Sequence, residues 1–384
     1  MKRLSLAFLP AILLGEPVTA AANVPGQIPP PPVAMVAPEV AAQYVRPHTL
    51  VDVGGRKIIL FCMGEGATTV LFDAGGSDWS VIWALVQPAI ARNARACTYD
   101  RAGLGYSDAD PGPRTPFAIA EDLDGLLRAA KLPRPLVLVG HSLGGFNMKL
   151  YAALHPEDVA GLVLIDPSEE RDSDRSRDFI TKGWGASVAA QSELSGQRFL
   201  KSLMSRYRDC AEAAGKAPLD TADISYRRCT DPVRPALGPI IAAERAALQR
   251  EAKYQRAQAS EILNSIYGDS GADKAYANLF RPGMFRAMPL FVLTAPQEGG
   301  EEPVDAADAA AGNRLHDETA RLSTAGCRDE AAGSGHNIQI DRPDVVIDLV
   351  NRMVAEVQLR KRRATTGTGR TGNPGRTVRQ CARG

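Results

Sequence analysis

The stretch Leu136-Val137-Leu138-Val139-Gly140-His141-Ser142-Leu143-Gly144-Gly145 decides the fold, because an apolar run leads directly into the pattern G-x-S-x-G. The apolar run predicts a strand covered on both faces, and residues 143–154 have the spacing of a helix. A turn this tight strains its central residue, and Gly140 and Gly144 leave the space that it needs. We therefore expect the Ser142 hydroxyl to stand exposed at the carboxyl edge of a sheet, over a helix N-terminus that favours negative charge.

Further strand signals lie on both sides of this segment. Apolar runs predict strands at 49–53, 56–62, 69–73, 95–99, 136–140, 161–166, 290–294 and, more weakly, 327–330. Gly54-Gly55 suits a hairpin turn between the first two strands, whereas helical patterns separate the later ones. The alternation predicts an α/β fold with a mostly parallel, eight-stranded sheet and helices on both faces.

The interval between the sixth and seventh strands predicts an inserted unit. Residues 168–288 are charged and mostly helical in pattern, and they are too many for a bare loop. We expect them to form a helical cap over the carboxyl edge of the sheet. The core domain is then divided into residues 45–167 and 289–359.

The two ends of the chain carry composition signals of their own. Lys2 and Arg3 precede an apolar run, and small residues follow it, so residues 1–22 are expected to be a secretory signal peptide. Residues 23–44, rich in proline in their first part, are expected to be a linker. Residues 360–384 contain many arginines and no acidic residue, which predicts a disordered basic tail. These signals predict a secreted or periplasmic protein with no transmembrane segment.

Charge and cysteine content bound the possible partners. A formal net charge of +1 over 384 residues gives no indication of a nucleic-acid partner. Six cysteines in an exported chain favour disulfides, and none has zinc-site spacing, so we expect neither a metal nor another cofactor. Two pairs are expected and two cysteines stay unassigned: Cys62 with Cys97, Cys210 with Cys229, and Cys327 and Cys381 left open.

A serine nucleophile needs a base at neutral pH, and histidine has the ordinary pKa for that task. His336 lies in Gly333-Ser334-Gly335-His336-Asn337, a loop between the last strand and the final helix. From there an imidazole can reach across the sheet edge to Ser142. The other histidines lie before the core, beside the serine, at the end of the following helix and within a later helical stretch: His48, His141, His155 and His316.

A carboxylate should fix the tautomer of this histidine. Asp166 ends the strand next along the chain and is favoured, because attachment to a buried strand holds it well. Three glutamates after the strand at 290–294 stay open as alternatives: Glu298, Glu301 and Glu302.

Charge on a substrate oxygen needs backbone donors as well. Leu143 follows the serine and supplies one N–H, and the turn Ala74-Gly75-Gly76-Ser77 can supply the other from Gly76.

Together these marks resemble the α/β-hydrolase fold superfamily. The matching segments are the turn at 74–76, the run from Tyr99 to Asp108, the elbow around Ser142, and Gly335-His336 before Arg342-Pro343. The resemblance implies Ser142 as nucleophile, His336 as base, and an oxyanion hole from Gly76 and Leu143. The chain departs from the family pattern at two places. It has Ala74 where relatives often have histidine, and it lacks a Gly-x-x-Asp pattern after the seventh strand.

We therefore expect a serine hydrolase that cleaves a carboxylic ester of a small molecule through an acyl-enzyme. The same apparatus in an aminopeptidase-like enzyme would cleave amides, and a non-catalytic binding protein on this fold is the third interpretation. The resemblance disfavours dehalogenase and epoxide hydrolase chemistry, because those relatives have aspartate where this chain has Ser142. Neither a particular substrate nor an oligomeric state is predicted.

Overall fold

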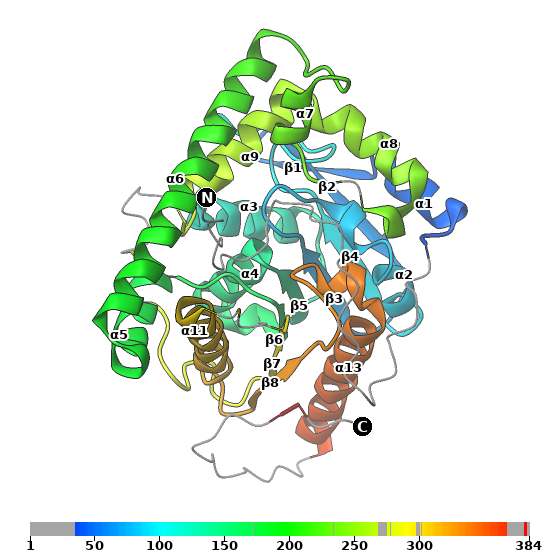
Figure 1. Cartoon of the computed structure of the whole chain (residues 1–384). Helices are drawn as coiled ribbons and strands as arrows, with labels where there is room; N and C mark the ends of the chain where they lie inside the picture. The colour runs from blue at the N-terminus through cyan, green and yellow to red at the C-terminus, as the bar shows by residue number, and fades with distance from the viewer. Residues whose placement is uncertain are drawn as a thin grey trace.

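The computed structural model describes residues 35–170, 172–232, 234–267, 275–276, 278–296, 300, 302–366 and 380–381. The expected signal peptide, the proline-rich part of the expected linker and most of the expected tail lie outside these described residues. At the centre of the molecule a sheet is enclosed by helices, and an arch of further helices runs along one side and over the top (Figure 1).

Eight strands form one sheet, as the sequence predicts, and their order in the sheet is β1-β2-β4-β3-β5-β6-β7-β8. The pairs β1 with β2 and β2 with β4 are antiparallel, and the other pairs are parallel. Every expected strand is present, with ends that differ by two residues at most. The strands are β1 Thr49–Val53, β2 Arg56–Met63, β3 Thr69–Asp73, β4 Arg95–Tyr99, β5 Leu136–His141, β6 Val159–Ile165, β7 Leu290–Thr294 and β8 Gly326–Glu330.

The pairing of the parallel strands determines which residues lie at the carboxyl edge of the sheet. Asp73 of β3 pairs with Gly140 of β5, and His141 pairs with Ile165 of β6. The carboxyl ends of these three neighbouring strands therefore lie side by side. The segments that follow them, which begin with Ala74, Ser142 and Asp166, start from one edge of the sheet.

Helices pack on both faces of the sheet because its central strands are apolar throughout. One core joins the strands to α3, α4 and the end of α11, and the other joins them to α2 and α13. In Figure 1, α4 and α11 lie to the left of β5 to β8, and α13 lies to the right. The helices outside the insertion are α1 Pro38–Tyr44, η1 Ser80–Trp83, α2 Gln87–Ile90, α3 Pro116–Ala129, α4 Leu143–Leu154, η2 Pro156–Asp158, α11 Pro303–Ala320, α12 Ile338–Asp341 and α13 Pro343–Thr366, where η marks a 3-10 helix.

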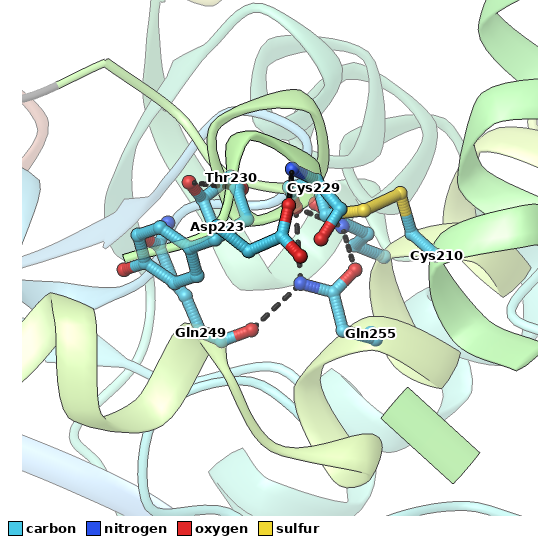
Figure 2. Close-up of a disulfide and its surroundings, with 9 residues drawn as sticks. Cys210, Asp223, Cys229, Thr230, Gln249 and Gln255 are labelled. Atoms are coloured by element: carbon cyan, nitrogen blue, oxygen red, sulfur yellow. Dashed lines mark hydrogen bonds between the residues drawn. A yellow bond between two sulfur atoms is a disulfide. The ribbon is translucent and has the colours of Figure 1, made fainter. Parts of the chain in front are cut away.

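The insertion between β6 and β7 is helical, as expected for a cap. Its helices are α5 Asp172–Trp184, α6 Ala186–Lys216, α7 Ile224–Cys229, η3 Pro235–Leu237, α8 Gly238–Gln249 and α9 Ala252–Asn264. A disulfide ties Cys210 of α6 to Cys229 at the end of α7. Figure 2 shows the side-chain amide of Gln255 bonded to the carbonyl oxygens of Cys229, at 3.0 Å, and Gln249, at 2.6 Å. These bonds join the disulfide-linked segment to α9.

All six cysteines are paired. Cys62 and Cys97 stand directly opposite each other on the antiparallel strands β2 and β4, which explains the first expected disulfide. The second expected pair, in the cap, is also confirmed. The two cysteines left open form a third bond, from Cys327 at the start of β8 to Cys381.

Two expectations about the ends of the chain are wrong in part. Residues 38–44, placed in the linker, form helix α1, whose Ala41 and Tyr44 are buried. The expected disordered tail begins too early, because α13 continues to Thr366, and Cys381 is buried and disulfide-bonded. Within the described residues, no helix combines the length and apolar character needed to cross a bilayer.

Candidate active site

Ser142 occupies a strained turn between β5 and α4. Its backbone has φ 51° and ψ −122°, a conformation that costs energy for any residue with a side chain. The turn closes tightly: a Cβ on Gly140 would lie 2.4 Å from the carbonyl oxygen of Gly144, and one on Gly144 would lie 2.3 Å from that of Ala74. The two glycines of G-x-S-x-G are therefore required by space. Contrary to the expectation of an exposed hydroxyl, Ser142 is only 4% exposed.

Asp166 and His336 meet at this edge of the sheet. Asp166 follows β6, and its Oδ2 accepts a hydrogen bond from His336 Nδ1 at 2.6 Å. Its Oδ1 accepts from the backbone N–H of Ala295 at 3.0 Å. Burial opposes ionisation of this carboxyl, but the hydrogen bond and the charge of His336 outweigh it and hold the pKa of Asp166 below its ordinary value.

The contact with Asp166 sets the tautomer of His336. Because Nδ1 donates its proton to a carboxylate, Nε2 is left as the acceptor of the ring. The Ser142 hydroxyl has its hydrogen bond with Ser168 Oγ, at 3.4 Å, and forms none with His336. Proton transfer from Ser142 to Nε2 therefore needs the serine hydroxyl to turn towards the imidazole. Catalytic hydrogen bonds are often long or misaligned before a substrate binds.

A second histidine holds the loop that carries His336. His141 Nε2 donates to the backbone carbonyl of His336 at 2.8 Å, and His141 Nδ1 accepts from the side-chain amide of Gln339 at 3.1 Å. Burial and the neighbouring His336 lower the pKa of His141 to about 3, so the ring is neutral. Sequence reasoning gave this histidine no role. Its place inside the G-x-S-x-G pattern was the available signal.

The turn with Gly76 lies against the residue that follows Ser142. A Cβ built on Gly76 would be 3.6 Å from Leu143 Cδ2, and one on Gly75 would be 3.4 Å from Ser142 Cβ. Arg101 fixes this turn, because its guanidinium donates to the carbonyl oxygens of Ala74 and Gly75, each at 2.7 Å.

Arg101 also links the turn to the cap. Its guanidinium contacts Asp73 at the end of β3 and Glu261 of α9, both at 2.6 Å, and all three side chains are buried. The sequence marked the segment around Arg101 as a family motif, but it gave no indication of the cap glutamate.

A second buried charge cluster joins the cap to both loops of the site. Asp78, just after the glycine turn, bonds Arg245 at 2.6 Å and Arg234 at 3.1 Å. Arg245 also contacts Asp231 at 3.0 Å, and Arg234 donates to the side-chain oxygen of Asn337, the neighbour of His336. Burial and the Asp78 carboxylate raise the pKa of Asp231 to about 6. Breaking such a cluster on one side costs about 3–5 kcal/mol, so the cap is firmly anchored over the site.

Among the described residues, none of the glutamates considered as alternatives to Asp166 contacts His336. Glu298 and Glu301 lie outside the described residues. Glu302 is described, is exposed, and directly precedes α11.

One group of side chains in the described residues could bring three metal-ligating atoms together: Asp124, His155 and Asp158. Arginines already neutralise both carboxylates, since Arg128 pairs with Asp124 and Arg134 with Asp158. The chemistry of this group is therefore that of an ion-pair cluster.

Fold and site together define a class. Residues 58–343 match the family model described as alpha/beta hydrolase fold, and the chain belongs to this family. An AB hydrolase superfamily protein of Gibberella zeae is 24% identical over 322 residues, which cover 79% of this chain and 92% of that protein.

Other curated relatives match over shorter segments. Those that share 31–34% identity are covered by this chain over only 16–42% of their own length.

Two solved structures illustrate the structural likeness. That of DBJA has a TM-score of 0.57 at 16% identity, and the match covers 80% of this chain and 98% of DBJA. The enol-lactonase from Burkholderia xenovorans has a TM-score of 0.49 at 18% identity, and the match covers 80% of this chain and all of that one. At 16% identity the similarity to DBJA concerns the fold alone.

Proposed function

We propose that this chain is a serine hydrolase that cleaves a carboxylic ester of a small molecule through an acyl-enzyme intermediate. The observation that carries the proposal is the 2.6 Å hydrogen bond between His336 Nδ1 and Asp166 Oδ2, formed beside the strained Ser142. With Nδ1 bonded to the carboxylate, Nε2 is left as the acceptor of the ring at the sheet edge that carries the Ser142 hydroxyl, which is the arrangement that a general base needs. Belonging to the alpha/beta hydrolase fold family agrees with this chemistry.

In the proposed reaction Ser142 Oγ attacks the carbonyl carbon while its proton passes to His336 Nε2. Asp166 stabilises the imidazolium that results. The backbone N–H groups of Gly76 and Leu143 donate to the negative oxygen, and each such donor contributes about 3 kcal/mol to the transition state. The leaving alcohol takes the proton from His336, and water then attacks the serine ester by the same steps in reverse.

The cover over the nucleophile supports a small substrate. Ser142 is 4% exposed, and buried ion pairs fasten the cap that covers it. A folded polypeptide cannot bring an internal bond to such a site. Three disulfides also support the secreted or periplasmic location proposed from the first residues, because disulfides persist in oxidising compartments.

A fluorophosphonate probe tests the nucleophile and its base. We expect the purified protein to be labelled and to hydrolyse p-nitrophenyl esters of short acids, and both activities to be lost in Ser142→Ala and His336→Ala. Ser187→Ala, a change at an exposed serine of the cap helix α6, is the matched control and should keep both. A wild-type protein that neither reacts with the probe nor hydrolyses any ester would contradict the proposal and favour the non-catalytic binder.

A further inference from the structure

A chain of hydroxyl groups leads from the nucleophile into the cap. Ser142 Oγ lies 3.4 Å from Ser168 Oγ, and Ser168 Oγ is hydrogen bonded to the phenol oxygen of Tyr267. The backbone N–H of Ser168 also donates to the carbonyl oxygen of Ser142 at 3.0 Å, which fixes the two serines relative to each other. The mechanism above uses neither Ser168 nor Tyr267.

Strand order places these hydroxyls on a definite side of Ser142. The glycine turn with Gly76 follows β3, on one side of β5, and Ser168 follows β6, on the other side. His336 is held on the β6 side as well, by its hydrogen bond to Asp166. Gly76, one of the two proposed oxyanion donors, and the Ser168 hydroxyl therefore flank the nucleophile from opposite sides, with the imidazole on the side of Ser168.

In an acyl transfer the leaving-group oxygen must lie next to the imidazole that protonates it. The water that attacks the acyl-enzyme occupies the same place, because the second half of the reaction reverses the first with water in place of the alcohol. A hydroxyl on the imidazole side of Ser142 thus lies where this oxygen is bound.

We propose that Tyr267, acting with Ser168, is a substrate-contacting residue that donates a hydrogen bond to the leaving-group oxygen and to the water that replaces it. This inference rests on the proposed function and deepens it, since it assigns the cap a part in the reaction. The bond between the acyl carbon and the leaving oxygen breaks, and that oxygen takes its proton from His336 Nε2. Tyr267 and Ser168 keep their own protons and stabilise the charge that develops on the oxygen.

The surroundings of Tyr267 suit a donor that stays protonated. Burial raises the pKa of Tyr267 to about 12, so the phenol is neutral at physiological pH. Its ring packs against an apolar cluster that the cap helices α6 and α9 form, with Leu203, Tyr207 and Ile262 at its centre. Ile262 also approaches the glycine turn, since a Cβ on Gly76 would be 3.7 Å from its Cδ1. The ring is thereby held in place above the site.

Esters whose leaving groups differ in basicity distinguish a tyrosine that donates a hydrogen bond to the leaving oxygen from a tyrosine with a purely structural role. A p-nitrophenolate ion leaves without help, whereas an alkoxide needs hydrogen bonding and protonation. We expect Tyr267→Phe to lower kcat/KM for an ethyl ester by about tenfold or more and to change that for the p-nitrophenyl ester of the same acid by less than about threefold. Ser168→Ala should show the same selectivity for the leaving group.

Tyr226→Phe is the matched control, because Tyr226 packs against the cluster around the cap disulfide and should leave both rates unchanged. An equal loss on both esters in Tyr267→Phe and Ser168→Ala, or no loss on either, would overturn the inference while leaving the proposed function intact. If the unmodified protein hydrolyses neither ester, both proposals are refuted.

Discussion

Replacing Asp166 by asparagine tests the assignment of the acid at the level of single atoms. In the structure Oδ1 accepts from the Ala295 N–H at 3.0 Å, and Oδ2 accepts from His336 Nδ1 at 2.6 Å. Asparagine keeps the first bond only if its carbonyl oxygen takes the place of Oδ1, and its NH2 group then faces His336. Two donors cannot bond each other, so the ring proton moves to Nε2, which can no longer accept the Ser142 proton.

We expect Asp166→Asn to lower kcat by about 10⁴-fold, which corresponds to about 5 kcal/mol of transition-state stabilisation. KM should change little, because Asp166 acts through His336 and does not touch the substrate. The assay is steady-state hydrolysis of a p-nitrophenyl ester at neutral pH. Asp158→Asn is the matched control, since Asp158 is a buried aspartate at the opposite end of β6, paired with Arg134. A kcat within tenfold of wild type would refute the reasoning and point to the glutamates after β7.

Two further predictions concern space and charge. A Cβ on Gly75 would be 2.9 Å from His141 Nδ1, whereas Gly76 has room for one. We therefore expect Gly75→Ala to lower kcat by about tenfold or more and Gly76→Ala to lower it less. A larger loss of kcat in Gly76→Ala than in Gly75→Ala would contradict the geometry. Burial and the Asp100 carboxylate raise the pKa of Glu244 to about 8. The folded protein therefore favours the neutral side chain, and the folding stability present in acid is lost as pH rises through about 8. Glu244→Gln should therefore raise Tm by about 2 °C or more at about pH 9 and have little effect at about pH 4, and thermal melts with the same difference at both pH values would exclude this cause.

The central strands of the fold were predictable because each of them is a short run of apolar residues. Leu136 to Val139 and Leu162 to Ile165 are buried on both faces, and that is how a central parallel strand reads in sequence. Helix α1 was missed because its seven residues begin with Pro38 after a proline-rich stretch. Proline at the first position of a helix is compatible with helix formation, so the composition misled the prediction.

The site was predictable only where it depends on single segments. Ser142 and His336 are indicated by their own loops, and the preference for Asp166 followed from its attachment to a strand. The contacts with the cap were not predictable, since Arg101 meets Glu261 across 160 positions and Asp78 meets Arg245 across 167. No local sequence pattern indicates that two residues so far apart in the chain will form an ion pair. For the same reason, the burial of Ser142 under the cap could not be predicted from the turn alone.

The bond between Cys327 and Cys381 gives the last part of the chain a covalent topology of its own. Residues 328–380 are closed into a ring, and helix α13 belongs to that ring. A protease that nicks the backbone once inside the ring releases no fragment, because both pieces stay attached through the sulfur atoms. Such damage is invisible on a non-reducing gel and appears only after thiol treatment, so a preparation that looks intact in an oxidising medium can already be cut.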